Sequence, residues 1–180
     1  AEARNHSLQM LPPGEGWVFT VDSDEVHDPE GLALITRQIL PALPGSVGIL
    51  DAYNLLFIQS FRYLGGLERR HNQFVRRTPE LTWSRAVHEH LHGARGERLA
   101  APYVFGHFGY VRPPEEMLDK WNLYARLGDP TSDPEELASQ AAEACLEEWM
   151  PRCHRYRGRH PQVLDGLRET LERGTSYVAR

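Results

Sequence analysis

The order of strand-forming and helix-forming segments is the feature that most constrains how this chain can fold. Aromatic and β-branched residues typical of strands recur in the first 111 positions, beginning with the run 16–21. Helix signals dominate from Pro114 to the C-terminus. Such segregation predicts an α+β fold, in which a small antiparallel or mixed sheet from the N-terminal half packs against C-terminal helices.

Several local signals place the expected elements more closely. Asp28 and Pro29 mark a helix start, and apolar residues at helical spacing continue it to Pro41. A second helix is expected over 82–92, where Thr82 provides an N-cap and Gly93 a stop. The segment 54–64 fits either a buried strand or a helix begun at Asp51. The remaining expectations are strands at 73–77 and 103–111 and helices from Pro114, over 132–148 and over 161–173.

A length of 180 residues predicts one domain covering the whole chain, in which residues 1–13 form an N-terminal arm. The 41% hydrophobic and 25% charged composition is that of a globular protein. The longest apolar runs have four residues, far from the ~20 that a membrane helix needs. No signal-peptide pattern opens the chain, although a start at Ala1 leaves open a leader removed before it.

The net charge of −5 disfavours a nucleic-acid-binding surface over the whole protein. Nineteen of the 20 basic residues are arginines, and eight of these lie within residues 62–98, which is where an anionic ligand is expected. Cys145 and Cys153 do not form a disulfide framework. Two reduced thiols predict a cytoplasmic protein.

The sharpest motif is H-E-x-x-H, formed by His88, Glu89 and His92. On a helix, the two histidines lie one turn apart and point toward one metal ion. Glu89 would then lie beside the ion, where it can act as general base toward a zinc-bound water. The motif thus favours a small zinc-dependent hydrolase of peptidase or amidase type, acting on a peptide or small molecule.

In this motif the chain resembles the gluzincin metallopeptidases over about forty residues. The resemblance implies that His88 and His92 are zinc ligands and that Glu115 or Glu116 is the third ligand. Asp119 would steady a ligand imidazole from outside the metal shell. His107 is an alternative third ligand, which would make a three-histidine site.

A second group of residues could carry out catalysis without a cofactor. Arginines, aromatic residues and carboxylates between positions 69 and 108 suit an acid/base enzyme of specialised metabolism that binds a carboxylated aromatic substrate. The order Arg70, His88, Glu97 is similar to that of bacterial Pictet–Spengler enzymes, which condense tryptophan with an aldehyde, and implies Glu97 as proton carrier. The expected substrate-binding residues are Arg70, Arg77, Trp83, Phe105 and Phe108.

Two interpretations involve no catalysis. The Arg-rich and aromatic-rich middle of the chain could serve as a binding module for an acidic partner or RNA. The late helices carry an apolar stripe that suits either the core or a contact between two copies of the chain. The stripe consists of Ala138, Ala142, Cys145, Leu146 and Trp149.

Overall fold

The computed structural model describes residues 1–12, 14–86, 88–127, 153–160 and 164. The helices expected over 132–148 and 161–173, the apolar stripe of the late helices and Cys145 lie outside these residues, apart from Leu164. No helix within the described ranges is long and apolar enough to cross a membrane.

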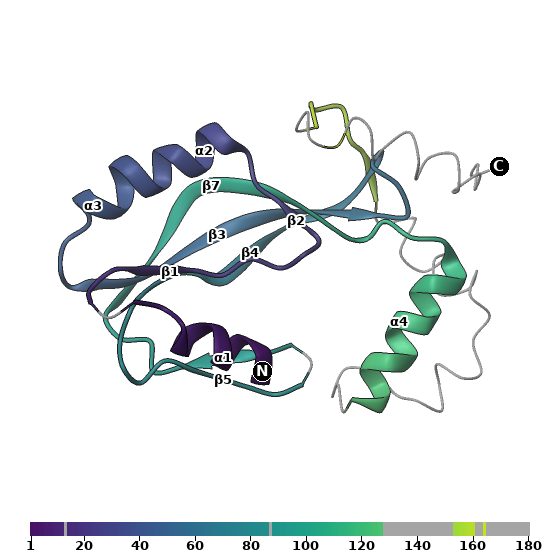
Figure 1. Cartoon of the computed structure of the whole chain (residues 1–180). Helices are drawn as coiled ribbons and strands as arrows, with labels where there is room; N and C mark the ends of the chain where they lie inside the picture. Colours follow the sequence, from purple (N-terminus) through teal and green to yellow (C-terminus); the bar gives the residue numbers. More distant parts are fainter. Residues whose placement is uncertain (13, 87, 128–152, 161–163, 165–180) are drawn as a thin grey trace.

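A six-stranded mixed sheet confirms the predicted α+β fold (Figure 1). The central strand β3 pairs with β4 in antiparallel and with β7 in parallel orientation. The spatial order is β1-β4-β3-β7-β2, and β8 pairs with β4. The strands are β1 (Trp17–Phe19), β2 (Glu25–Val26), β3 (Val47–Ile58), β4 (Tyr63–Arg76), β7 (Glu97–Tyr110) and β8 (His154–Arg155).

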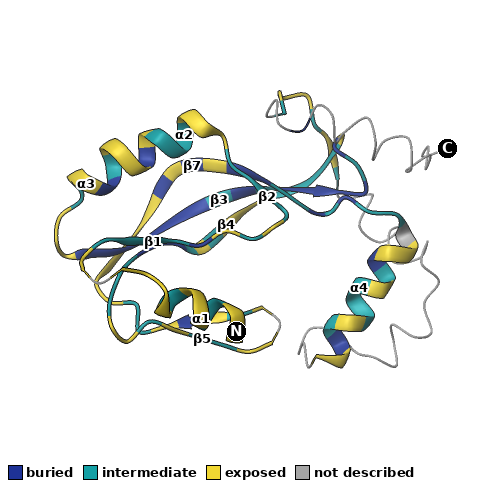
Figure 2. Cartoon of the chain, viewed as in Figure 1, coloured by how far each residue is buried: buried dark blue, intermediate teal, exposed yellow. Residues whose placement is uncertain are grey.

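The segment 54–64 was ambiguous between a strand and a helix, and the structure shows no helix there: residues 54–58 end β3, 59–62 form a turn, and 63–64 begin β4. Ten of the twelve residues of β3 are buried, because neighbouring strands flank it on both sides and other elements cover both of its faces (Figure 2). A strand buried on both faces is a nearly continuous apolar run without clear alternation. That is why the run fitted a helix equally well.

One face of the sheet is covered by a continuous helical segment, as predicted for residues 28–41. It consists of α2 (Pro29–Leu34), the π-helical turn η1 (Ile35–Ile39) and α3 (Leu40–Ala42). Ile35 and Leu40 from this segment pack on Leu50, Phe74 and Phe105 of the sheet to form the main core cluster. The Asp28 carboxylate caps the segment by accepting a hydrogen bond of 2.7 Å from the Gly31 amide.

This cap gives a modest stability prediction. Asp28→Ala is expected to lower the free energy of unfolding by about 1 kcal/mol, because the first turn loses its hydrogen-bond acceptor. Urea denaturation measures the change. Asp119→Ala, an exposed substitution within α4, serves as control and should stay within ~0.5 kcal/mol of the original. Equal loss in both variants would contradict the role of the cap.

The helix predicted over 82–92 is wrong: these residues form a hairpin of β5 (Thr82–Ser84) and β6 (His90–His92). Arg85 and His88 have positive φ angles, of 68° and 48°, which a right-handed helix does not allow. Asn5 of α1 (Glu2–Gln9) holds the Trp83 backbone in place. Its side chain accepts from the Trp83 amide at 2.6 Å and donates to the Trp83 carbonyl at 2.8 Å. Tertiary contacts therefore outweigh the local helix signals.

The helix expected from Pro114 is confirmed as α4 (Pro114–Arg126). It follows directly on the end of β7, so its residues lie near the same end of the sheet as the β1–β2 connection (Figure 1). On the side of the sheet opposite α2 and α3 lie α1 and the β5–β6 hairpin. The predicted N-terminal arm is thus partly helical, and it packs on that hairpin.

Candidate functional site

A polar pocket of about 400 Å³ lies where the β1–β2 connection, α1, the β5–β6 hairpin and α4 meet. Its lining is rich in charged side chains of both signs. The residues are Arg4, Asp22, Ser23, Asp24, Arg70, Trp83, His88, Glu89, His107, Tyr110, Lys120 and Tyr124. We call it the Asp22–Asp24 pocket.

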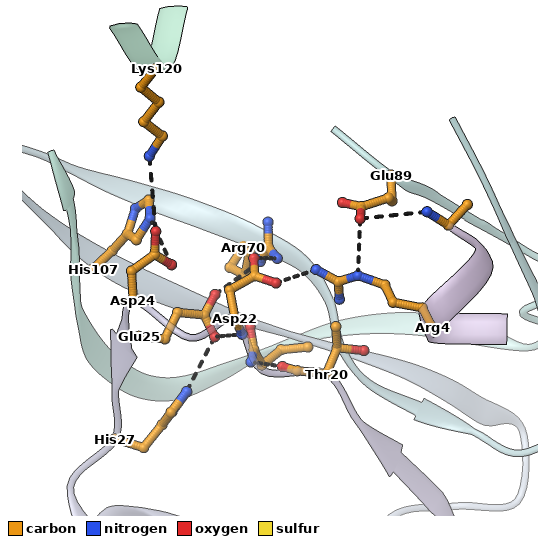
Figure 3. Close-up of polar contacts among 12 residues, drawn as sticks. Arg4, Thr20, Asp22, Asp24, Glu25, His27, Arg70, Glu89, His107 and Lys120 are labelled. Atoms are coloured by element: carbon orange, nitrogen blue, oxygen red, sulfur yellow. Dashed lines mark hydrogen bonds and ion pairs between the residues drawn. The ribbon is translucent and has the colours of Figure 1, made fainter. Parts of the chain in front are cut away.

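Asp22 lies between two guanidinium groups (Figure 3). Arg70 of β4 donates to its Oδ2 at 2.6 Å, and Arg4 of α1 donates to its Oδ1. Arg4 also lies 3.3 Å from Glu89 through Nε and stacks over the Trp83 ring at 4.8 Å. The carboxylates of Asp22 and Glu89 therefore share one cation, which ties α1 to the pocket.

Glu25 holds the turn below Asp22. Its side chain is only 2% exposed and lies 3.4 Å from Arg70 Nε and 3.3 Å from His27 Nε2. Its carboxylate also accepts a hydrogen bond from the Asp22 amide. Because every one of these contacts lies within the protein, Glu25 fixes the position of Asp22 rather than facing the pocket.

Asp24 occupies the other side of the pocket. His107 Nε2 lies 3.5 Å and Lys120 Nζ 4.0 Å from its carboxylate oxygens (Figure 3). The hydrogen bond with His107 outweighs burial and lowers the pKa of Asp24 below its usual value. Burial lowers the pKa of Lys120, although Asp24 opposes this effect. Asp24 is accordingly a carboxylate at neutral pH, facing two nitrogen donors.

A close approach at Gly109 permits this position of Asp24. An ideal Cβ at Gly109 would lie 2.3 Å from Asp24 Oδ2, so any side chain there would displace the carboxylate. The Gly109 carbonyl accepts hydrogen bonds from Lys120 at 3.1 Å and from Arg112 at 3.2 Å. The glycine thus brings the carboxylate and the ammonium group together.

The structure brings five of the predicted site residues into this pocket: Arg70, Trp83, His88, Glu89 and His107, the alternative third ligand. His88 is exposed and lies edge-on to Tyr124 of α4, with ring centroids 5.6 Å apart. Glu89 is half-buried against Arg4. The two neighbours reach one pocket from a turn, not from the helix that the motif predicted.

The other predicted residues lie elsewhere. His92 is exposed, 2.7 Å from Ser84, and Glu115 and Glu116 are exposed at the start of α4. The four predicted zinc ligands are therefore not brought together. Within the described ranges, no group of three or more His, Cys, Asp or Glu side chains could by itself hold a metal ion.

The substrate-binding residues of the cofactor-free interpretation are also dispersed. Phe105 is part of the main core, and Phe108 stacks on Phe57 in a second cluster. Arg77 donates to the carbonyls of Leu11 and Pro12 in the N-terminal segment. Glu97 is exposed at the start of β7, outside the pocket.

The sequence contains a local signal for the residues that were missed. Asp22 and Asp24 form a D-x-D pair in an acidic turn directly after a predicted strand. Lys120, the only lysine of the chain, and Arg4 carry no such signal, because distant contacts bring them to the turn. No protein-family model, no curated protein and no solved structure matches the chain.

Proposed function

We propose that this chain is an enzyme that binds a divalent cation through Asp22 and Asp24, and with it a phosphate-bearing substrate. The observation that carries the proposal is the pairing of these two carboxylates, on one turn, with three cationic side chains in one pocket. The cations are Arg4, Arg70 and Lys120.

The donor set favours a hard cation. Carboxylate oxygens suit Mg²⁺ and Mn²⁺, whereas zinc sites are built mainly from imidazole and thiolate groups. Mg²⁺ in enzymes is typically held by one or two carboxylates and completed by substrate phosphates and water. Asp22 and Asp24, two residues apart on a turn fixed by Glu25, provide such a pair.

Charge balance favours a phosphate as the second ligand. The pocket has three carboxylates, Asp22, Asp24 and Glu89, against the three cationic side chains. A divalent cation on the aspartates would add two positive charges and release Arg70 from Asp22 and Lys120 from Asp24, while Arg70 keeps its contact with Glu25. A phosphate dianion would restore neutrality, and phosphate oxygens match the paired donors of a guanidinium group.

The surrounding side chains suggest how the chemistry proceeds. A bound cation would polarise a phosphoryl oxygen and stabilise the charge that develops there. Arg70 and Lys120 would orient the same phosphate and share its charge. Glu89, which pairs with Arg4, would accept a proton from an attacking hydroxyl or water once Arg4 has moved away. The phosphorus–oxygen bond to the leaving group would break as the new one forms, and the cation would stabilise the charge on the leaving oxygen.

A zinc-dependent hydrolase is the second candidate. It is favoured by His88 and Glu89 of the H-E-x-x-H motif, which line the same pocket as His107. Imidazoles suit zinc, and Glu89 would keep its role as general base. On this alternative the ligands come from the hairpin and β7 rather than from one helix. The cofactor-free acid/base enzyme has less support. Two of its expected substrate-binding residues, Arg70 and Trp83, line the pocket, but Glu97, its expected proton carrier, does not.

Metal titration distinguishes these functions. Mn²⁺ binding is measured by electron paramagnetic resonance with and without inorganic pyrophosphate. We expect pyrophosphate to tighten Mn²⁺ binding at least ~10-fold, because the two ligands share the pocket. It should also protect Lys120, the only lysine, from an amine-reactive reagent, as mapped by mass spectrometry. Zinc binding without pyrophosphate coupling would instead favour the hydrolase, and binding of neither metal would contradict both.

A further inference from the structure

A second pocket, of about 380 Å³, adjoins the first over strands β3 and β4. The two pockets share Arg70, Trp83 and Glu89 as a common wall. The second pocket reaches the sheet at Thr20 and Asn54, so we call it the Thr20–Asn54 pocket. It contains neither aspartate of the first pocket.

The floor of this pocket holds two buried oxygens that need partners. Thr20 and Asn54 are 7% exposed each. Thr20 Oγ1 and Asn54 Oδ1 have no hydrogen-bond partner among the described residues. Buried polar atoms in native proteins are nearly always paired, so two unmatched oxygens in one cavity favour an occupant that supplies hydrogen-bond donors. The Asn54 side-chain oxygen can only accept a hydrogen bond, so its partner must be a donor such as a hydroxyl group.

The rim of the pocket carries a fixed pair of guanidinium groups. Arg98 donates to Asp51 Oδ1 at 2.6 Å, and Arg69 donates to Asp51 Oδ2 at 2.9 Å. Asp51 is fully buried, whereas about two-fifths of each arginine side chain is exposed. One carboxylate thus holds two cations in place, and Arg98 also donates to the Asn72 side-chain oxygen at 2.9 Å. Glu68 and Glu89 line the pocket as well, so an acidic group of a ligand would have to lie beside Arg69 and Arg98. The remaining donors suit an anionic group on a ligand.

We infer that the Thr20–Asn54 pocket binds a polyhydroxylated anion, such as a sugar acid or a sugar phosphate. The ligand hydroxyls would bond to Thr20 and Asn54, and its acidic group would lie at Arg69 and Arg98. Trp83 provides an apolar wall for the C–H groups of a sugar ring. Apart from Trp83, which lines both pockets, the inference stands on side chains outside the Asp22–Asp24 pocket and does not require a metal there.

Four test ligands separate the contribution of the hydroxyl groups to binding from that of the acidic group. Binding of glucuronate, glucose 6-phosphate, glucose and inorganic phosphate to the full chain is measured by calorimetry without added metal. We expect glucuronate or glucose 6-phosphate, or both, to bind at least ~10-fold more tightly than glucose or phosphate alone. Only these two combine hydroxyl groups for the floor of the pocket with an acidic group for the arginines at its rim. Equal binding of phosphate, or no binding of either sugar anion at millimolar concentration, would overturn the inference.

Two substitutions test the floor of the pocket. Thr20→Val keeps the shape of the side chain, and Asn54→Leu keeps its branching at Cγ with a somewhat larger volume; both remove the unpaired oxygens. Since these oxygens have no partner in the described protein, the melting temperature should hold or rise, while affinity for the sugar anion falls at least ~10-fold. Arg95→Gln, outside the pocket lining and in an exposed pair with Glu80, is the control and should leave binding unchanged. Unchanged affinity in Asn54→Leu would show that water alone serves these oxygens.

Discussion

Replacing Asp24 by asparagine is expected to weaken Mn²⁺ binding at least ~100-fold and to abolish its coupling to pyrophosphate. The substitution keeps the shape of the side chain and removes the charge that holds the cation. Loss of partners outside the first metal shell already costs 10- to 100-fold in metal affinity, so loss of a ligand should cost at least as much. Asp22→Asn should behave in the same way, whereas the zinc-hydrolase alternative does not require Asp22.

A steric variant tests the same site without changing any charged residue. In Gly109→Ala the new methyl group meets Asp24 Oδ2 and must displace it. Mn²⁺ affinity should therefore fall at least ~10-fold, within the range seen when a metal ligand loses its support. Gly66→Ala is the matched control, because a Cβ there meets no atom within 4 Å. Normal Mn²⁺ binding by Gly109→Ala would show that Asp24 is not a ligand.

The fold class was predictable because its signals are local. Asp28 caps its helix through a contact three residues away, and Pro114 begins α4 as its fixed φ angle favours. Strand β3 was ambiguous for a physical reason, since burial on both faces removes the alternation that identifies a strand. The β5–β6 hairpin was not predictable from its own residues, because Asn5 of α1 holds the backbone of Trp83.

The candidate site was predictable only in part, for a related reason. The Arg-rich middle of the chain does contribute Arg70, and H-E-x-x-H does mark His88 and Glu89 as pocket residues. However, Asp22 meets Arg70 across 48 positions of sequence. A short acidic turn gains its chemical character from such partners, which only the sheet topology brings together. The D-x-D pair is also too short to stand out from an ordinary solvated turn.

A buried carboxylate provides the largest stability prediction. Asp51 of β3 is fully buried and accepts from Arg69, Arg98, His71 and the Asn72 amide. Asp51→Ala is expected to lower the free energy of unfolding by about 2–3 kcal/mol, because the Asn72 amide loses its buried acceptor and the half-exposed arginines lose their partner. Urea denaturation measures this loss. Glu80→Ala, which breaks an exposed pair with Arg95, should cost no more than ~1 kcal/mol.

The pH dependence of the unfolding free energy shows whether Asp51 stabilises the protein by its charge or by its packing. Burial raises the pKa of Asp51, but the Asn72 amide and the His71 and Arg98 charges outweigh it, and the pKa in the folded state lies below its usual value. A group whose pKa is lower in the folded state stabilises the protein fully above its unfolded pKa of about 3.9. That stabilisation is lost as the pH falls through the folded pKa. The difference in unfolding free energy between the original protein and Asp51→Asn should therefore be largest near neutrality and shrink below about pH 4. A difference independent of pH would mean that Asp51 stabilises the sheet by shape and not by charge.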